Sequence, residues 1–112
     1  MYMNKNNIKC PVDMGLSLIG GKWKMLIIGR IFENNKIRFN ELKRVVGNIS
    51  TQELARKLNE LCQDNLVLKV TKKSQNVEYS LTNFGKSAVP IIIALKEWSY
   101  GKKNTICKYA SK

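Results

Sequence analysis

"NELKRVVGNISTQELARKLNEL", residues 40–61, is the stretch that decides the fold. Asn40 is a suitable N-cap for a short helix over residues 41–46, and Gly47 is the residue type that most often follows a helix end. The two residues after Gly47 are then the whole turn, because a second helical pattern begins at Ser50. The sequence therefore predicts a helix, a short turn and a helix.

The second helix has a marked start and a one-sided apolar face. Ser50 and Glu53 have the spacing of a capping box, in which each side chain satisfies a backbone N–H at the helix start. At about 100° per residue, the leucines beyond them fall on one narrow face, which we expect to be buried. These leucines are Leu54, Leu58 and Leu61.

The polar face of the same helix carries side chains whose ends suit the edges of DNA bases. Arg can pair bidentately with guanine, and Gln or Asn can pair with adenine in the same way. A face that only meets water would more often carry Glu and Lys, but a solvated face remains the alternative. The residues concerned are Gln52, Arg56, Asn59 and Gln63.

Two strands and a polar loop follow this helix. Residues 66–71 and 77–81 have strand-like composition, and the second segment alternates apolar and polar side chains. The polar residues between them, 72–76, suit the tip of a hairpin. A hairpin directly after a helix-turn-helix is typical of a winged helix-turn-helix, in which one helix enters the major groove and the wing contacts the DNA backbone.

Before the motif, the sequence predicts two helices and an extended piece. Pro11, directly after Cys10, opens a helix that ends at Gly20. Residues 22–32 have apolar side chains dense enough for a largely buried helix, and residues 37–39 form a brief extended piece.

After the hairpin, Thr82 is placed to cap a last helix over residues 83–100. Pro90 lies inside it and predicts a kink. Residues 101–112 form a basic tail that we expect to be frayed.

Length and composition fit one domain. The chain has 112 residues, of which 44% are hydrophobic, enough for a single core. The predicted fold is mostly α with a small β-hairpin, a winged helix-turn-helix with N- and C-terminal helices for dimerisation. It occupies residues 1–112 as a single domain, with its core over about residues 10–100.

The chain is strongly basic, since 20 Lys and Arg against 8 Asp and Glu give a formal charge of +12. This charge favours a polyanionic partner, although its even spread leaves a merely solvated basic surface as the alternative. The longest apolar run, residues 88–95, is too short to cross a bilayer. The first ten residues contain no apolar segment typical of a secretory signal. We expect a cytoplasmic protein with no membrane partner.

Four stretches, in this order and spacing, carry a resemblance to a known family. They are "CPVDMGLSLIGGKW" at residues 10–23, "IRFNELKRVVGNIS" at 37–50, "ARKLNEL" at 55–61 and "VEYSLTNFGKS" at 77–87, with Pro90 and Trp98 beyond. Over about residues 10–100 the chain resembles the HxlR-type winged helix-turn-helix transcriptional regulators.

The resemblance implies a bacterial or archaeal regulator that binds double-stranded DNA, normally as a homodimer held by its terminal helices. It also implies that residues 50–62 are the recognition helix and residues 72–76 the wing. Two features depart from the family. The wing looks shorter than usual and lacks prolines, and Thr51 and Gln52 stand where many relatives carry Pro and Lys.

Motif and resemblance together give the expected DNA contacts. On the recognition helix they are Ser50, Thr51, Gln52, Ala55, Arg56 and Asn59. The basic groups expected on phosphates or in the wing are Arg38, Lys43, Lys57, Lys72 and Lys73. Any one of these cations is also explained as a plain surface charge. A structural role is a further alternative for Lys57, because relatives usually carry Arg there.

The last predicted helix is apolar almost all round between residues 88 and 95, and a winged-helix core has enough helices to bury itself. We therefore expect this helix to pack on a second copy, the alternative being that it packs inside its own monomer. A two-fold dimer would present recognition helices about 34 Å apart to a pseudo-palindromic DNA site. The expected interface residues are Met14, Leu18, Ile92, Leu95 and Trp98.

Cys10 is the redox candidate among the three cysteines. It precedes a helix start and follows Lys9, surroundings that lower the pKa of a thiol. The resemblance implies the same role, since some family members use the cysteine of an N-terminal Cys-Pro pair to sense electrophiles or disulfide stress. The alternative is a structural thiol at the dimer interface. Cys62 and Cys107 are weaker redox candidates.

No metal site, cofactor or catalytic centre is expected. The chain has no His and no paired-cysteine spacing for zinc, and its acids do not form a recognisable cluster. Gly20 and Gly21 lack the continuation of a phosphate-binding loop. The sequence thus predicts a regulator that is not an enzyme, binds DNA sequence-specifically and responds to thiol oxidation if Cys10 is a sensor. The alternative is a winged-helix module that binds protein or RNA without operator recognition.

Overall fold

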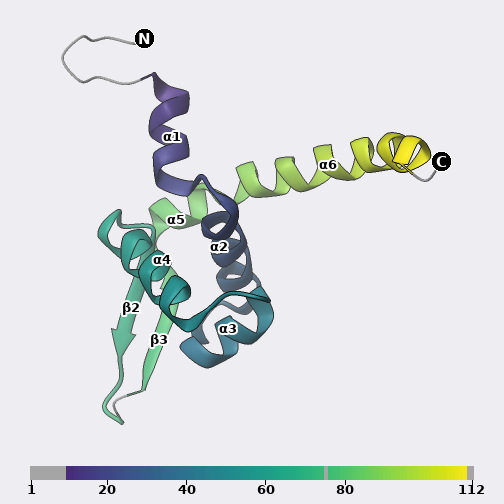
Figure 1. The fold of residues 1–112 in the computed structure, drawn as a ribbon. Coiled ribbons are helices and arrows are strands. Elements are labelled where there is room, and N and C mark those ends of the chain that lie inside the picture. Colours follow the sequence, from purple (N-terminus) through teal and green to yellow (C-terminus); the bar gives the residue numbers. More distant parts are fainter. Residues whose placement is uncertain (1–9, 75, 111–112) are drawn as a thin grey trace.

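The structure of the chain, a computed structural model, describes residues 10–74 and 76–110, with side chains to residue 101. The elements combine into a winged helix-turn-helix, mostly helical with a small antiparallel sheet, as predicted (Figure 1). In chain order they are α1 (Pro11–Ile19), α2 (Lys22–Asn34), β1 (Ile37–Arg38), α3 (Phe39–Val46), α4 (Thr51–Gln63), β2 (Val67–Thr71), β3 (Val77–Leu81), α5 (Asn83–Ser87) and α6 (Val89–Ala110).

The predicted hairpin is present and belongs to a slightly larger sheet. The Lys72 N–H donates to the Asn76 carbonyl at 2.7 Å and closes the loop between β2 and β3. The extended piece forms β1 and pairs antiparallel with β3, with Ile37 opposite Tyr79, so the strand order is β1-β3-β2. The extended piece was predicted, but its pairing into the sheet was not, because the partner of so short a strand lies far along the chain.

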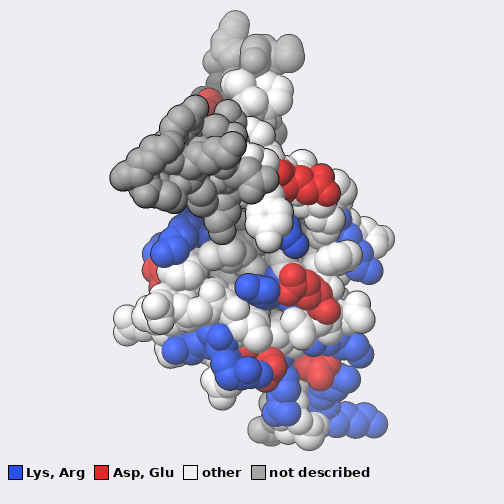
Figure 2. All heavy atoms as spheres, turned by 90° about the vertical axis from the view of Figure 1, so that its right-hand side faces the viewer, with Lys and Arg blue, Asp and Glu red and all other residues white. Residues whose placement is uncertain are grey.

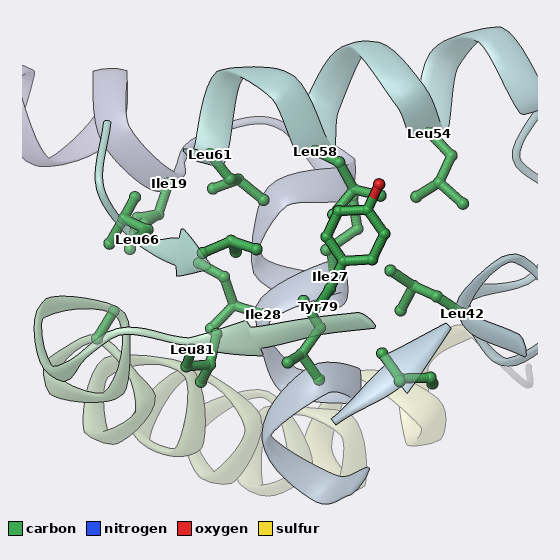
Figure 3. Packing of buried hydrophobic residues seen from close by; sticks show 14 of the residues in the cluster. Ile19, Ile27, Ile28, Leu42, Leu54, Leu58, Leu61, Leu66, Tyr79 and Leu81 are labelled. Atoms are coloured by element: carbon green, nitrogen blue, oxygen red, sulfur yellow. The ribbon is translucent and has the colours of Figure 1, made fainter. Parts of the chain in front are cut away.

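The core lies between α2, α4 and the sheet (Figure 3). Its central side chains are Ile27, Ile28 and Ile31 of α2, Leu54, Leu58 and Leu61 of α4, and Tyr79 and Leu81 of β3. The predicted burial of the α4 leucines is confirmed, since each is at most 2% exposed. Full burial of a side chain of this size contributes about 1.5–3 kcal/mol. This packing fixes which face of α4 is turned outward.

The start of α4 follows the prediction only in part. The Ser50 side chain accepts a hydrogen bond from the Glu53 N–H at 3.0 Å, so the expected cap forms. Among the described residues, however, the Glu53 carboxylate contacts Arg56 and Lys57 and does not return to the Ser50 N–H. Half of the capping box is therefore realised, because cations one turn along the helix compete for the carboxylate.

The start of α3 differs from the prediction. The helix begins at Phe39, so Arg38 is its N-cap residue and Asn40 lies inside the first turn. The pairing of β1 with β3 holds the chain extended through Arg38, and this tertiary constraint outweighs the intrinsic preference of Asn40 for a cap. The end of α3 is as predicted, with Gly47 as the C-cap.

The predicted helix over residues 83–100 is in fact two helices, α5 and α6, separated at Ala88. Pro90 explains the break, because it lacks the N–H that would bond to the Lys86 carbonyl and its ring would crowd that group. Pro90 instead lies in the first turn of α6, where a missing N–H costs nothing.

The expectation of a frayed tail after Tyr100 was wrong for residues 101–110, because α6 continues to Ala110. Gly101 lies inside the helix, where one glycine costs only about 1 kcal/mol and does not stop it. Both α1 and α6 extend away from the body formed by the other elements (Figure 1).

Candidate nucleic-acid interface

The turn between α3 and α4 is tightly specified. Gly47 has a φ of 115°, in the region where a side chain would be strained. Ile49 is 4% exposed and anchors the turn in the core, and its N–H donates to the Gly47 carbonyl at 2.8 Å. The direction of α4 relative to α3 is therefore fixed by a glycine conformation and one buried side chain.

The α4 residues expected to contact DNA lie together on the outer surface. Each of them is exposed, and the buried leucines of the same helix point the opposite way (Figure 3). Exposure on one helix face is what the reading of base edges in a groove requires. The residues are Ser50, Thr51, Gln52, Ala55, Arg56 and Asn59.

A chain of ion pairs runs along one side of α4. An Arg56 guanidinium nitrogen donates to Glu53 Oε1 at 2.5 Å, and this contact raises the pKa of Arg56. The other terminal nitrogen of Arg56 lies 3.6 Å from Glu60 Oε2, and Lys57 Nζ lies 3.7 Å from Glu60 Oε1. Exposed pairs of this kind contribute at most about 1 kcal/mol each. Arg56 can therefore exchange these carboxylates for a base edge at small cost.

Lys24 of α2 joins this network from inside the protein and was missed by the sequence analysis. It is only 8% exposed, its Nζ lies 3.3 Å from Glu60 Oε1, and it donates to the Ser17 carbonyl of α1 at 3.3 Å. Burial alone would raise the pKa of Glu60, but contact with Lys24 and the charges of Lys57 and Arg56 lower it. A lysine within the dense apolar pattern of α2 was the signal that could have identified this link.

The cations in and beside the wing differ in their partners. Lys72 Nζ lies 3.4 Å from Glu78 Oε1, so part of its charge is neutralised. Arg38 of β1 donates to the Asn76 side-chain oxygen at 2.5 Å and ties the wing to the start of α3. Lys73 is exposed at the tip.

Among the described residues, Arg38, Lys43 and Lys73 have no carboxylate partner, whereas Lys57 and Lys72 do. Figure 2 shows blue side chains concentrated at the lower end of the molecule, where Figure 1 places α3 and the tip of the hairpin. The unpaired cations are therefore the stronger candidates for contact with phosphates.

The cysteines lie in different surroundings. Cys10 is half-buried at the start of α1, while Lys9, its expected neighbour, is outside the described residues. Cys62 is also half-buried, and burial raises the pKa of its thiol. The Cys107 side chain lies outside the described part of the chain.

The residues expected at a dimer interface fall into two groups. Met14, Leu95 and Trp98 are 52%, 43% and 62% exposed, whereas Leu18 and Ile92 are half-buried against the monomer's own core. Further exposed apolar side chains of the same two helices are Val12, Leu16, Ile91, Ile93 and Tyr100.

Residues 18–106 match the sequence pattern of the family described as HxlR-like helix-turn-helix. The chain belongs to this family. The resemblance seen in the sequence is thereby confirmed, and the protein is a transcriptional regulator of the helix-turn-helix, DNA-binding type.

Relatives of this HxlR-like protein match over nearly its whole length. It is 36% identical over 113 residues to YybR of Bacillus subtilis, described as an uncharacterized HTH-type transcriptional regulator, covering 99% of this chain and 88% of YybR. It is 43% identical over 102 residues to an HTH-type regulator of Halalkalibacterium halodurans, covering 89% of this chain and 90% of the relative.

Solved structures of HxlR-like and related regulators have the same fold. The redox regulator HypR in its reduced form superposes with a TM-score of 0.80 at 35% identity, covering 89% of this chain and all of HypR. The oxidised form of HypR gives a TM-score of 0.77 at 38% identity, with 82% and 96% coverage.

Membrane-spanning helices and groups of metal ligands are both absent from the described part of the chain. None of its helices has the length and apolar character needed to span a membrane. No set of three or more His, Cys, Asp or Glu side chains is grouped there as metal ligands would be.

Proposed function

We propose that this HxlR-like regulator recognises a pseudo-palindromic operator as a homodimer in the cytoplasm, with α4 in the major groove. The observation that carries the proposal is the outward face of α4, where exposed Gln52, Arg56 and Asn59 stand opposite buried leucines. These three side chains have the hydrogen-bonding ends that distinguish guanine and adenine in the major groove.

Cations without a carboxylate partner among the described residues support the placement of this face on DNA. Lys73 lies in the wing, Arg38 lies on β1 and contacts Asn76 of the wing, and Lys43 lies on α3. Contacts from such groups to phosphates fix the orientation of a protein on the duplex, while the side chains of the recognition helix supply sequence preference.

The homodimer is supported by the exposed apolar side chains of α1 and α6. The Cα radius of gyration is 16.4 Å, against about 13 Å for a compact domain of about 100 residues, because these helices project from the body. Apolar surface such as that of Met14 and Trp98 is costly to leave in water. A two-fold pairing of these helices would bury it and place two α4 helices on one face.

Thiol control through Cys10 is supported by its place at the start of α1, one of the proposed dimer helices, and by the likeness to HypR, which is described as a redox regulator. Burial raises the pKa of the Cys62 thiol, which makes Cys62 a weaker redox candidate. Treatment with diamide should change the DNA affinity of the wild type and leave that of Cys10→Ser unaltered. An equal change in both proteins would exclude Cys10 as the sensor.

The experiment that tests operator recognition begins with selection of preferred duplexes from a random pool. Fluorescence anisotropy then compares the selected duplex with a scrambled duplex and with single-stranded RNA across a salt series. We expect specific binding at least about 10³-fold tighter than binding to the scrambled duplex, with affinity falling as salt rises. Equal affinity for all three nucleic acids would contradict operator recognition.

A further inference from the structure

A cleft of about 520 Å³ lies behind the wing, on the side of the sheet away from α4. It is enclosed by the C-terminal part of α2, the β2–β3 hairpin and α5. This volume falls within the range of sites that bind small organic molecules, which is about 300–1,000 Å³. Nothing in the proposed reading of DNA by α4 makes use of this cleft.

The floor of the cleft is apolar. Ile31 and Leu81 form its buried part, while Phe32 is 46% and Val70 is 39% exposed to it and to solvent. An aromatic face and a branched side chain held open on opposite elements suit a flat apolar body.

The rim is cationic. Lys36, Lys72 and Lys86 line the cleft with a single carboxylate, that of Glu78. Lys72 is the lysine paired with this carboxylate, at 3.4 Å, and among the described residues Lys36 and Lys86 have no acidic partner. The cleft therefore has an excess of positive charge over an apolar floor, and this combination is complementary to an organic anion.

Glu78 adds a second polar feature. Its carboxylate lines the cleft with the side chain 25% exposed, and Lys72 Nζ lies 3.4 Å from Oε1. A carboxylate can accept more than one hydrogen bond, so a hydroxyl group on a ligand can donate to it beside Lys72.

We propose that this cleft binds a small aromatic acid that also carries a hydroxyl group. The ring system lies over Phe32 and Val70, the carboxylate meets Lys36 and Lys86, and the hydroxyl donates to the Glu78 carboxylate. Lys72 belongs both to the cleft and to the wing, so the negative charge of an acid bound in the cleft lowers the positive potential at the wing. An occupied cleft therefore weakens the wing's contact with phosphates; this consequence rests on the proposed function.

The test measures ligand binding in the absence of DNA. A negative result would therefore contradict the ligand proposal without bearing on operator recognition. The full-length protein is titrated with 6-hydroxy-2-naphthoate, followed by the fluorescence of the ligand. The comparison ligands are 2-naphthoate, which lacks the hydroxyl, and 6-hydroxy-2-naphthamide, which lacks the charge. We expect saturable binding of the hydroxy acid, with the amide weaker by about tenfold or more and the acid without hydroxyl weaker by about fivefold.

Variants locate the site. Lys36→Gln combined with Lys86→Gln should weaken hydroxynaphthoate about tenfold. Glu78→Ala should abolish the preference for the hydroxylated acid. The matched control is Lys96→Gln, which removes a lysine from the apolar groove between α2 and α6 and should leave affinity unchanged.

Three results would overturn the proposal. They are the absence of saturable binding, equal affinity for acid and amide, and an equal loss in the Lys96 control. Thermal unfolding of each variant confirms that the exchanged surface residues leave the fold intact. In a separate measurement on the selected duplex, the hydroxy acid should lower DNA affinity in the wild type and not in the double lysine variant.

Discussion

Gly85 shows how a single residue holds α5 against the rest of the fold. A Cβ atom at this position would lie 2.0 Å from the Leu66 carbonyl oxygen and 3.0 Å from its carbonyl carbon, both backbone atoms. The Thr82 hydroxyl accepts the Gly85 N–H at 2.9 Å and donates to the Asn65 carbonyl at 2.7 Å. Close backbone approach therefore requires glycine here.

We predict that Gly85→Ala lowers the free energy of unfolding by about 3 kcal/mol, because the backbone must shift to admit the methyl group. The matched control is Gly29→Ala in α2, where the nearest atom to an added Cβ is Ile92 Cγ2 at 3.9 Å. That variant should be neutral or stabilised by up to about 1 kcal/mol, as expected for alanine in a helix interior. Urea unfolding of both variants measures the difference, and a similar small effect in both would refute the steric account.

At the scale of helices and strands, Lys24 links α1, α2 and α4. We predict that replacing its partner Glu60 costs more stability than replacing Lys24 itself. Glu60→Gln removes the carboxylate partner of the 8%-exposed Lys24 ammonium and leaves it with neutral acceptors, the Ser17 carbonyl and the new amide oxygen, so it should cost about 2 kcal/mol of stability. Lys24→Met leaves Glu60 partly exposed and still near Arg56 and Lys57, so it should cost about 1 kcal/mol or less. Chemical denaturation ranks the two variants, and the reverse order would show that the pair is not governed by desolvation of Lys24.

The same elements show which features a sequence can predict. The cap at Ser50, the end of α3 at Gly47 and the burial of the α4 leucines depend on neighbours within about one or two turns, and all three were predicted correctly. The pairing of β1 with β3 and the contact of Lys24 with Glu60 join segments distant in the chain. A local pattern can mark a residue such as Lys24 as unusual, but it does not identify the distant partner.

Some parts of the candidate site could likewise be predicted from the sequence, and others could not. Helical periodicity was sufficient to place the exposed polar face of α4, because the angular position of each residue follows from the spacing. The i, i+3 spacing of Glu53 and Arg56 is a sequence signal for their ion pair. The cleft behind the wing could not be predicted, since its walls come from α2, the hairpin and α5.

For the whole molecule, the exposed apolar faces of α1 and α6 predict a dimer that depends on α6. The double variant Leu95→Glu with Trp98→Glu places charges on this surface and should give a monomer, with a mass near 12.8 kDa in place of twice that value. Leu68→Glu is the control, because Leu68 is 50% exposed on β2, outside both helices, and this variant should stay dimeric. Light scattering after size exclusion gives the masses. A wild-type monomer, or a dimer that survives the α6 changes, would contradict the proposed assembly.

Recognition of DNA by α4 is the central claim, and Arg56→Ala tests it most directly. Anisotropy titrations compare this variant with Lys73→Ala, which removes an unpaired cation at the tip of the wing. Loss of a bidentate base contact costs about 1–3 kcal/mol, so Arg56→Ala should bind the selected operator at least about fivefold more weakly while its affinity for a scrambled duplex changes little. Lys73→Ala should weaken both duplexes equally and reduce the salt slope by about one. If Arg56→Ala instead weakens operator and scrambled duplex to the same extent, α4 does not read the sequence in the way proposed.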